Sequence, residues 1–391
     1  MKRIFACLLS LFACYCPMDT IGAASLPPIP EEYAVYQDPV LPKVTAKSAI
    51  LIDAMTGQVL YSRQADVHHY PASTTKIMTL LVALERGNLD DIVTVSSRAA
   101  GVEGSTIWLE EGEQIRLEDL LYGMMLVSGN DATVAVAEHI AGSMDAFAQM
   151  MTDKAHAIGA VDTNFVNSSG LPDDNHYTTA HDLAMIAAYG YKNPVFARIV
   201  SAKEWSLLRT HEPKYHKLEN ENILLWIYPG ANGVKTGYTD AAGRCLVSAA
   251  NRNGIQLIAV VLDSLFMWND SIAMLNYGFQ QMKPQQMVAA GQIEGRVPVV
   301  GGRRRSLSVK AEQTLTVPVA ENSGTEKYSV ALRLPDYVQA AVREGDPVGS
   351  LEILYDGRTV ASTKLLAAQT VEKKSFFSYL YQQWRSVVAF L

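Results

Sequence analysis

The spacing of apolar positions changes along the chain and predicts the order of its elements. Segments 48–53 and 58–62 are short, largely apolar runs with a glycine-containing turn between them. Runs of this length bounded by turn residues are typical of strands. After them, the apolar run from Ile77 onward predicts a helix that begins near Ser73, continues to about residue 85 and stops near Gly87.

From there to about residue 200 the spacing is mainly helical, with two apolar helices expected at 117–127 and 131–140. Strands return at 233–239, 244–250 and 256–262, where Asn253-Gly254 predicts a hairpin turn. A further helix is expected from 269 to about 281. Two strands before the helices and three after them predict an α/β domain over 35–282, with an antiparallel five-stranded sheet and a helical insertion.

Beyond residue 282 the composition shifts to short alternating runs, such as 314–319 and 328–332, separated by turn residues. Alternation of this kind is typical of strands with one buried face. We therefore expect a small all-β domain over 283–370. A chain of 391 residues is long enough for such a multi-domain α/β protein.

The two ends of the chain carry apolar segments of different kinds. Residues 1–24 combine Lys2 and Arg3, an apolar stretch over 4–16 and a small-residue site at 22–24, which is the pattern of an export signal. The apolar stretch is shorter than the roughly 20 residues of a spanning helix. Segment 371–391 places aromatic and aliphatic residues at helical spacing between basic and polar ones. It predicts an amphipathic helix that anchors the protein peripherally to a membrane, with docking on the β domain as the alternative.

Charge and histidine spacing exclude several functions. A net charge of −7 gives no reason to expect nucleic-acid binding. Outside the expected signal, Cys245 is the single cysteine, so no intramolecular disulfide is expected. The chain has no His-Glu-x-x-His motif, and the adjacent His68 and His69 would point to different sides. We expect neither a metal nor a cofactor.

The candidate chemistry begins at Ser73 and Lys76, which lie three residues apart and would share one face of a helix. An amine can take a proton from a serine hydroxyl only when the amine is neutral. Burial and a neighbouring cation both lower the pKa of a lysine and favour that neutral form. The spacing alone is weak evidence, because Ser73 could simply cap the helix.

Two later motifs change this interpretation, namely Ser128-Gly129-Asn130 and Lys235-Thr236-Gly237. Together with Ser-x-x-Lys and in this order, they match the motif set of class A β-lactamases and penicillin-binding proteins, with Gly in place of the usual Asp. Each motif could also have a purely structural role: Ser128 could cap a helix, Asn130 could serve a turn, and Gly237 could mark a bulge. Joint occurrence is much less expected by chance than any single match.

On these motifs the chain resembles the serine D-alanyl-D-alanine carboxypeptidases, which are the low-molecular-mass penicillin-binding proteins. Segments 120–127 and 167–180 and the tripeptide Tyr277-Gly278-Phe279 extend the resemblance, which covers the chain from the signal to the terminal helix. The resemblance implies a β-lactamase/transpeptidase-like domain. It also implies removal of the terminal D-alanine from peptidoglycan stem peptides, acylation by β-lactams and a location outside the bacterial cytoplasmic membrane.

The resemblance also assigns roles. Ser73 would attack the carbonyl between the two D-alanines, and Lys76 would accept its proton. Ser128 would pass a proton to the leaving D-alanine, and Asn130 would hold the substrate amide and orient Lys76. The remaining substrate-binding residues would be Lys235, Thr236, Gly237, Tyr238 and Arg244.

Within that set, Lys235 would keep the local potential positive, Thr236 would bind the substrate carboxylate, and the backbone N–H groups of Ser73 and Tyr238 would form the oxyanion hole. One departure concerns the arginine that many relatives carry just after the last sheet strand, because segment 265–269 contains none. We hypothesise that Arg244 takes over that role; the alternative is that it faces solvent.

Two rival functions remain open at the level of sequence. A class A-like β-lactamase would need a deacylating glutamate on the loop 167–176, which offers Asp173 and Asp174 but no glutamate. A catalytically silent wall-binding scaffold would leave the intact motif trio unexplained. The preferred stem peptide, endopeptidase activity and oligomeric state are not determined by the sequence.

Overall fold

The computed structural model of the chain describes residues 41–207, 217–321 and 324–374. The expected export signal at 1–24 lies outside the described residues, as does most of the expected terminal helix, residues 375–391. The start of that prediction is wrong, because Val371 and Lys373 are extended and form β-bridges with Val342 and Gly302. The β unit therefore continues beyond residue 370. Within the described ranges, no helix combines the length and the apolar character needed to cross a membrane.

The first unit is built on an antiparallel sheet of five strands in the order β2-β1-β9-β8-β7. This confirms the predicted α/β class and its sheet. Each strand lies within two residues of its expected position: β1 (Ser48–Asp53), β2 (Val59–Arg63), β7 (Ala231–Thr239), β8 (Gly243–Arg252) and β9 (Ile255–Leu262).

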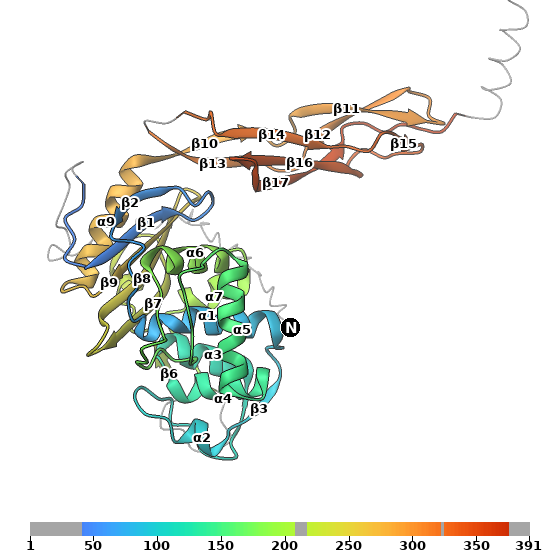
Figure 1. The fold of residues 1–391 in the computed structure, drawn as a ribbon. Helices are drawn as coiled ribbons and strands as arrows, with labels where there is room; N and C mark the ends of the chain where they lie inside the picture. Colours follow the sequence, from blue (N-terminus) through green and yellow to red (C-terminus); the bar gives the residue numbers. More distant parts are fainter. Residues whose placement is uncertain (1–40, 208–216, 322–323, 375–391) are drawn as a thin grey trace, which may run out of the picture.

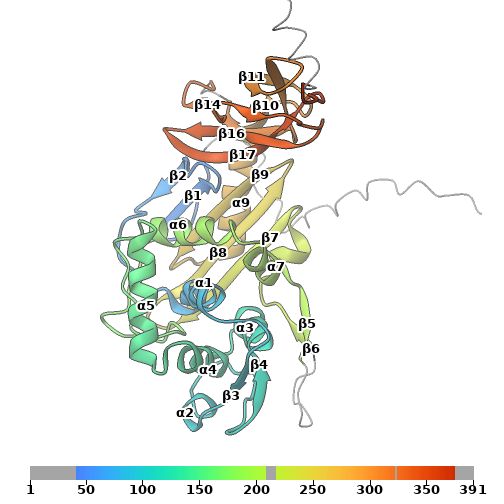
Figure 2. The ribbon, with the colours of Figure 1, turned by 90° about the vertical axis from the view of Figure 1, so that its right-hand side faces the viewer.

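Helices cover both faces of this sheet because alternate strand residues point to opposite sides. Ile50 and Val260 belong to the core shared with α1 (Lys76–Arg86) and the helical insertion. Leu51 and Val261 belong to the core shared with α9 (Met267–Gln281). Figures 1 and 2 show α9 on one side of the sheet and the insertion on the other.

The helical insertion surrounds α1, whose residues from Lys76 to Ala83 are all buried. The expected pair of apolar helices is present as α3 and α4, with a short break between them. The remaining helices of the first unit complete the insertion and its link to β7. The set comprises η2 (Ala72–Thr75), α2 (Ser97–Ala100), α3 (Leu117–Leu126), α4 (Asn130–Ala141), α5 (Met144–Ala157), α6 (Ala180–Gly190), α7 (Pro194–Ser201) and α8 (Leu224–Ile227).

Two short antiparallel ribbons were not expected from the sequence. One joins β3 (Ile92–Thr94) to β4 (Gln114–Arg116), and the other joins β5 (Glu204–Ser206) to β6 (Lys217–Glu219). A strand of three residues is too short to produce a recognisable alternation.

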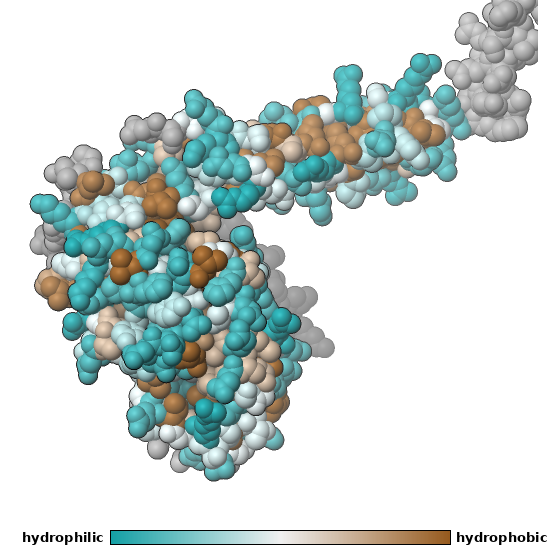
Figure 3. Space-filling view, viewed as in Figure 1, coloured by the Kyte–Doolittle hydropathy of each residue, from teal (hydrophilic) through white to brown (hydrophobic). Residues whose placement is uncertain are grey.

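The second unit contains only strands among its described residues, which confirms the predicted all-β fold. A two-stranded sheet pairs β10 with β13, and a six-stranded sheet follows the order β14-β16-β17-β12-β11-β15. Their bounds are β10 (Met282–Val288), β11 (Ile293–Val300), β12 (Ser306–Ala311), β13 (Leu315–Ala320), β14 (Tyr328–Arg333), β15 (Val338–Gln339), β16 (Pro347–Tyr355) and β17 (Arg358–Ala367). Figure 1 shows this unit extending away from α9, and Figure 3 shows a largely polar surface over both units.

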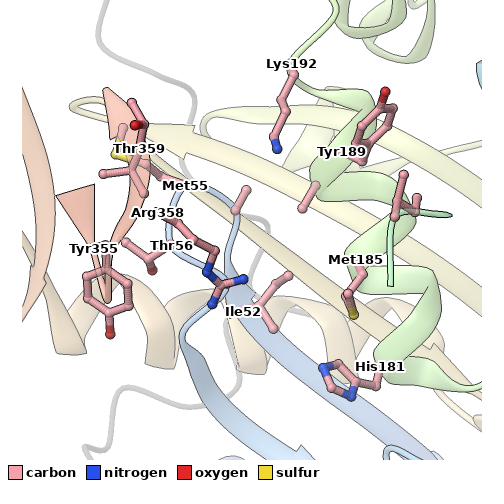
Figure 4. Close-up of a pocket in the computed structure, with 15 residues that line it drawn as sticks. Ile52, Met55, Thr56, His181, Met185, Tyr189, Lys192, Tyr355, Arg358 and Thr359 are labelled. Atoms are coloured by element: carbon pink, nitrogen blue, oxygen red, sulfur yellow. The ribbon is translucent and has the colours of Figure 1, made fainter. Parts of the chain in front are cut away.

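The two units meet where the turn between β1 and β2 approaches the turn between β16 and β17. Met55 packs against the core of the all-β unit. A cavity of about 190 Å³ lies here, and Figure 4 shows Arg358 from the β unit extending toward Ile52 and Thr56. None of the motif residues lines this cavity, so it is separate from the site described next.

Candidate active site

Ser73 and Lys76 lie at the start of the buried helix α1. Ser73 is in the 3-10 turn η2, and Lys76 is the first residue of α1 itself. Lys76 is fully buried, and its Nζ lies 2.8 Å from Ser73 Oγ. The structure therefore makes the contact that the Ser-x-x-Lys spacing predicts.

Lys76 makes two further hydrogen bonds, and both connect it to distant parts of the chain. Its Nζ donates to Asn130 Oδ1 at 2.8 Å and to the Ser169 carbonyl at 2.9 Å. Burial, reinforced by the positive charge of Lys235, holds the pKa of Lys76 well below its ordinary value. The neutral amine is thus favoured at the position where a base would be needed.

The second motif forms the break between α3 and α4. Ser128 has a φ of 64°, a left-handed conformation that is uncommon for a residue with a Cβ and is often found at functional sites. Asn130 is held from its other side, because its Nδ2 donates to the Glu103 carbonyl at 2.7 Å. The turn therefore fixes Asn130 against Lys76, while Ser128 faces the cavity described below.

The third motif lies on β7, at the edge of the sheet. Lys235 is buried, and its Nζ lies 3.2 Å from Thr236 Oγ1. Burial lowers the pKa of Lys235 to about 8, and the carboxylate of Glu221 opposes this shift. A lysine with this pKa keeps its charge at neutral pH, so the two buried lysines favour opposite charge states.

Gly237 brings β7 into close contact with η2. A Cβ atom added at Gly237 would lie 3.0 Å from the Ser73 amide nitrogen and 3.1 Å from that of Thr74. The next residue, Tyr238, has an exposed side chain whose hydroxyl donates to Asp240 at 2.8 Å. A side chain at position 237 would crowd the start of the helix, so glycine suits the close approach of β7.

These elements enclose a cavity of about 350 Å³ next to Ser73. Arg244 is not among its lining residues; its guanidinium lies 5.8 Å from the ring centre of Tyr238, on the neighbouring strand. Its role in carboxylate binding stays a prediction. The cavity is lined by Ser73, Ser105, Ser128, Glu221, Thr236, Gly237, Tyr238, Met267 and Trp268.

The loop after α5 supplies a functional group that the motifs do not predict. The carboxamide oxygen of Asn167 accepts from the backbone N–H groups of Ser169 and Gly170, which turns the Ser169 carbonyl toward Lys76. Gly170 has a φ of +90°, and a Cβ there would lie 1.8 Å from the Ala72 carbonyl oxygen. The glycine after Ser169 is the sequence signal for this close approach.

His176 forms hydrogen bonds with the start of the helix and with the loop after α5. Its ring accepts from the Val166 N–H at 3.1 Å and contacts the Thr75 hydroxyl at 2.8 Å. Burial lowers the pKa of His176 to about 4, so the ring is neutral at ordinary pH. The contact of His176 with Thr75 in η2 was not predicted from the sequence.

Metal ligands are not gathered anywhere in the described part of the chain. Cys245 is buried with a free thiol, and burial raises its pKa to about 12. A thiol with this pKa is a poor nucleophile at neutral pH.

A buried lysine in contact with a partly exposed serine, beside a cavity, is the arrangement expected of a serine hydrolase. Residues 34–265 match the profile of the D-alanyl-D-alanine carboxypeptidase family, and residues 283–373 match the C-terminal domain of penicillin-binding protein 5. The chain belongs to the D-alanyl-D-alanine carboxypeptidase family, whose members are serine hydrolases.

Individual relatives agree with this assignment. The chain is 33% identical to D-alanyl-D-alanine carboxypeptidase DacF of Bacillus subtilis, covering 86% of this chain and 88% of that protein. It is 32% identical to DacA of Escherichia coli, with 87% of each chain covered. Among solved structures, penicillin binding protein 5 from Haemophilus influenzae superposes with a TM-score of 0.61 at 30% identity, covering 85% of this chain and 99% of the other.

Proposed function

We propose that this protein is a serine D-Ala-D-Ala carboxypeptidase that removes the terminal D-alanine of peptidoglycan stem peptides through an acyl-enzyme on Ser73. The observation that carries this proposal is the 2.8 Å contact between Ser73 Oγ and the buried Nζ of Lys76. Membership of the carboxypeptidase family supports the choice of substrate.

The hydrogen bonds of Lys76 explain how it would act as the base. A neutral amine has two N–H bonds and one lone pair. The Asn130 Oδ1 and the Ser169 carbonyl can only accept, so they take both N–H bonds. The lone pair is then left for the Ser73 hydroxyl, whose proton it would accept as Oγ attacks the substrate carbonyl.

The remaining motif residues would serve the leaving group and the negative charges. Ser128 would pass a proton to the D-alanine nitrogen as the C–N bond breaks, and water would then hydrolyse the ester on Ser73. The backbone N–H groups of Ser73 and Tyr238 would bind the oxyanion, an interaction worth roughly 3 kcal/mol for each donor. Lys235 and Thr236 would bind the terminal carboxylate of the substrate.

The direct test is incubation with labelled penicillin followed by intact-mass analysis and peptide mapping. We expect one adduct, located on Ser73, and none in Ser73→Ala. The same preparation should release D-alanine from a D-Ala-D-Ala peptide. An unmodified wild-type protein would instead favour a silent wall-binding scaffold.

A β-lactamase is the second candidate that the same motifs allow. The acids of the loop 167–176 are engaged elsewhere, because Asp174 accepts from Tyr70 at 3.0 Å and Asp173 accepts from the Asn175 amide at 2.8 Å. Neither aspartate lines the cavity beside Ser73. Sustained hydrolysis of penicillin, rather than a long-lived adduct, would favour the lactamase.

We further propose that the protein is exported and attached peripherally to the outer face of the cytoplasmic membrane. The sequence of 1–24 supports export, and the amphipathic pattern of 371–391 supports attachment. In this proposal 35–282 is the catalytic domain, and 283–370 separates it from the membrane. Truncation after residue 374, which keeps the buried Val371 in the β unit, should move the enzyme from the membrane fraction to the soluble fraction with its peptidase activity retained.

A further inference from the structure

One acidic side chain lies among the residues that line the cavity beside Ser73, and the motifs do not account for it. Glu221 Oε2 is 3.2 Å from Thr236 Oγ1, which donates to it, and 3.8 Å from Lys235 Nζ. These are the two groups that the proposed function assigns to the carboxylate of the substrate. Glu221 therefore contacts the same donors that a bound substrate would need.

The backbone around Glu221 is fixed, while its side chain remains half exposed. The Glu221 N–H donates to the Leu126 carbonyl at 3.0 Å, and its neighbours Asn220 and Asn222 are buried. Asn222 donates to the Gly233 carbonyl on β7 at 2.9 Å. The side chain of Glu221 is 47% exposed, so it can rotate away from β7 without disturbing the core.

We propose that Glu221 is a specificity-determining residue that occupies the carboxylate subsite of the free enzyme and disfavours acyl donors with a free terminal carboxylate. This inference rests on the proposed function. Two carboxylates at one lysine–threonine pair repel each other, so an anionic donor must first displace Glu221. A donor with the same carboxyl group blocked by an ester or amide avoids most of that repulsion.

The discriminating measurement is a ratio of acylation rates. The second-order rate constant is measured for benzylpenicillin and for its methyl ester, in the wild type and in Glu221→Gln. We expect the variant to react roughly tenfold faster with benzylpenicillin, as removal of a neighbouring like charge predicts, and less than twofold faster with the ester. Glu219→Gln is the matched control, because Glu219 carries the same charge, is ion-paired with Lys217 and does not line the cavity.

Loss of Glu221 would also remove a partner of Lys235, so the measurement is made at pH 6, well below the pKa of about 8 of that lysine. A peptide pair gives a second readout. For a D-Ala-D-Ala peptide with a free carboxylate, Glu221→Gln should lower KM more than it changes kcat, and for the peptide amide KM should stay the same.

The outcomes separate this inference from the function on which it rests. A wild type that is acylated, with an ester-to-acid ratio unchanged or increased in Glu221→Gln, overturns the inference alone. A wild type that is not acylated by either penicillin overturns the proposed function and the inference with it. Equal thermal unfolding of wild type and variant shows that the comparison concerns intact protein.

Discussion

The catalytic unit and the all-β unit differ in the kinds of side chain that they bury. The cleft buries Lys76, Lys235 and Asn130, which are costly to remove from water unless they are paired. Beyond residue 282, the buried polar side chain among the described residues is Thr363, and the core consists of aliphatic residues. Burial of apolar residues stabilises both units, and in the first unit burial also changes the reactivity of polar groups.

This difference means that mutations in the two units should affect different measurements. Polar substitutions in the cleft should reduce catalysis far more than stability. Apolar truncations in the β unit should reduce stability and leave the chemistry at Ser73 intact. The following predictions test that separation, beginning with the largest expected effect.

Replacing Lys76 with alanine should reduce acylation by penicillin by about 10³-fold, because it removes the general base from Ser73. The midpoint of thermal unfolding should stay close to the wild-type value. The control is Lys154→Ala, which removes an ion pair with Glu85 outside the cleft. Acylation within tenfold of wild type in Lys76→Ala would remove Lys76 from the mechanism.

Replacing Ile353 with alanine should lower the stability of the β unit and leave acylation of Ser73 unchanged. Ile353 is fully buried in the core of the β unit, and such truncations cost about 2–5 kcal/mol. Thermal unfolding of the β unit should shift downward while the rate of acylation stays at the wild-type value. Val330→Ala, at a site that is 45% exposed, should change neither. A parallel fall of acylation in Ile353→Ala would show that the two units are coupled.

Acid should weaken the catalytic unit selectively through His176. Its pKa of about 4 lies below the value of roughly 6.5 in the unfolded chain, so between these values the unfolded state binds the extra proton. Stability should therefore fall as the pH decreases from 6.5 to 4, by on the order of 3 kcal/mol.

Urea unfolding across this pH range measures the effect of His176. His176→Gln should lack this part of the pH dependence. All eight histidines precede residue 282, so the β unit should not share it. An unchanged slope in the variant would place the titrating group elsewhere.

Replacing Gly237 with alanine should slow acylation by about 10²-fold, because the new Cβ would press on the Ser73 amide proposed for the oxyanion hole. Gly324→Ala is the matched control, since its Cβ would meet no atom closer than 3.9 Å. Wild-type rates in both variants would show that β7 can move away from η2 at little cost.

The smallest expected effect concerns Arg244. Its exposed side chain lies beside Tyr238 and outside the lining of the cavity, so a role in carboxylate binding would be long-range and screened. If Arg244 has this role, Arg244→Ala should raise KM for a D-Ala-D-Ala peptide by roughly two- to fivefold. Unchanged turnover would rule out the proposed substitution for the missing arginine.

Those parts of the fold and of the site that depend on a pattern of side chains could be predicted from the sequence. Strand β1 is a continuous apolar run because both of its faces are covered, and the expected five-stranded sheet followed from such runs. Ser73, Lys76, Ser128, Asn130 and Lys235 were identified as a set because their chemistry requires particular side chains in a particular order.

Other parts of the structure could not be predicted because no sequence pattern marks them. The Ser169 carbonyl contacts Lys76 across 93 positions of the chain, and any residue could supply a carbonyl. Glu221 lies outside the motifs, and its contact with Thr236 depends on how the segment before α8 packs against β7. The ribbons β3–β4 and β5–β6 are set by tertiary packing rather than by their own three-residue strands.

Everything proposed for catalysis depends on Lys76 being uncharged at neutral pH. NMR of protein labelled with ¹³C at the lysine ε-carbon, with Lys76→Ala used for assignment, follows the charge of this one side chain directly. We predict a titration midpoint well below the usual lysine range, and an upward shift when Lys235 is replaced by methionine. A Lys76 that remains charged throughout the neutral range would contradict the account.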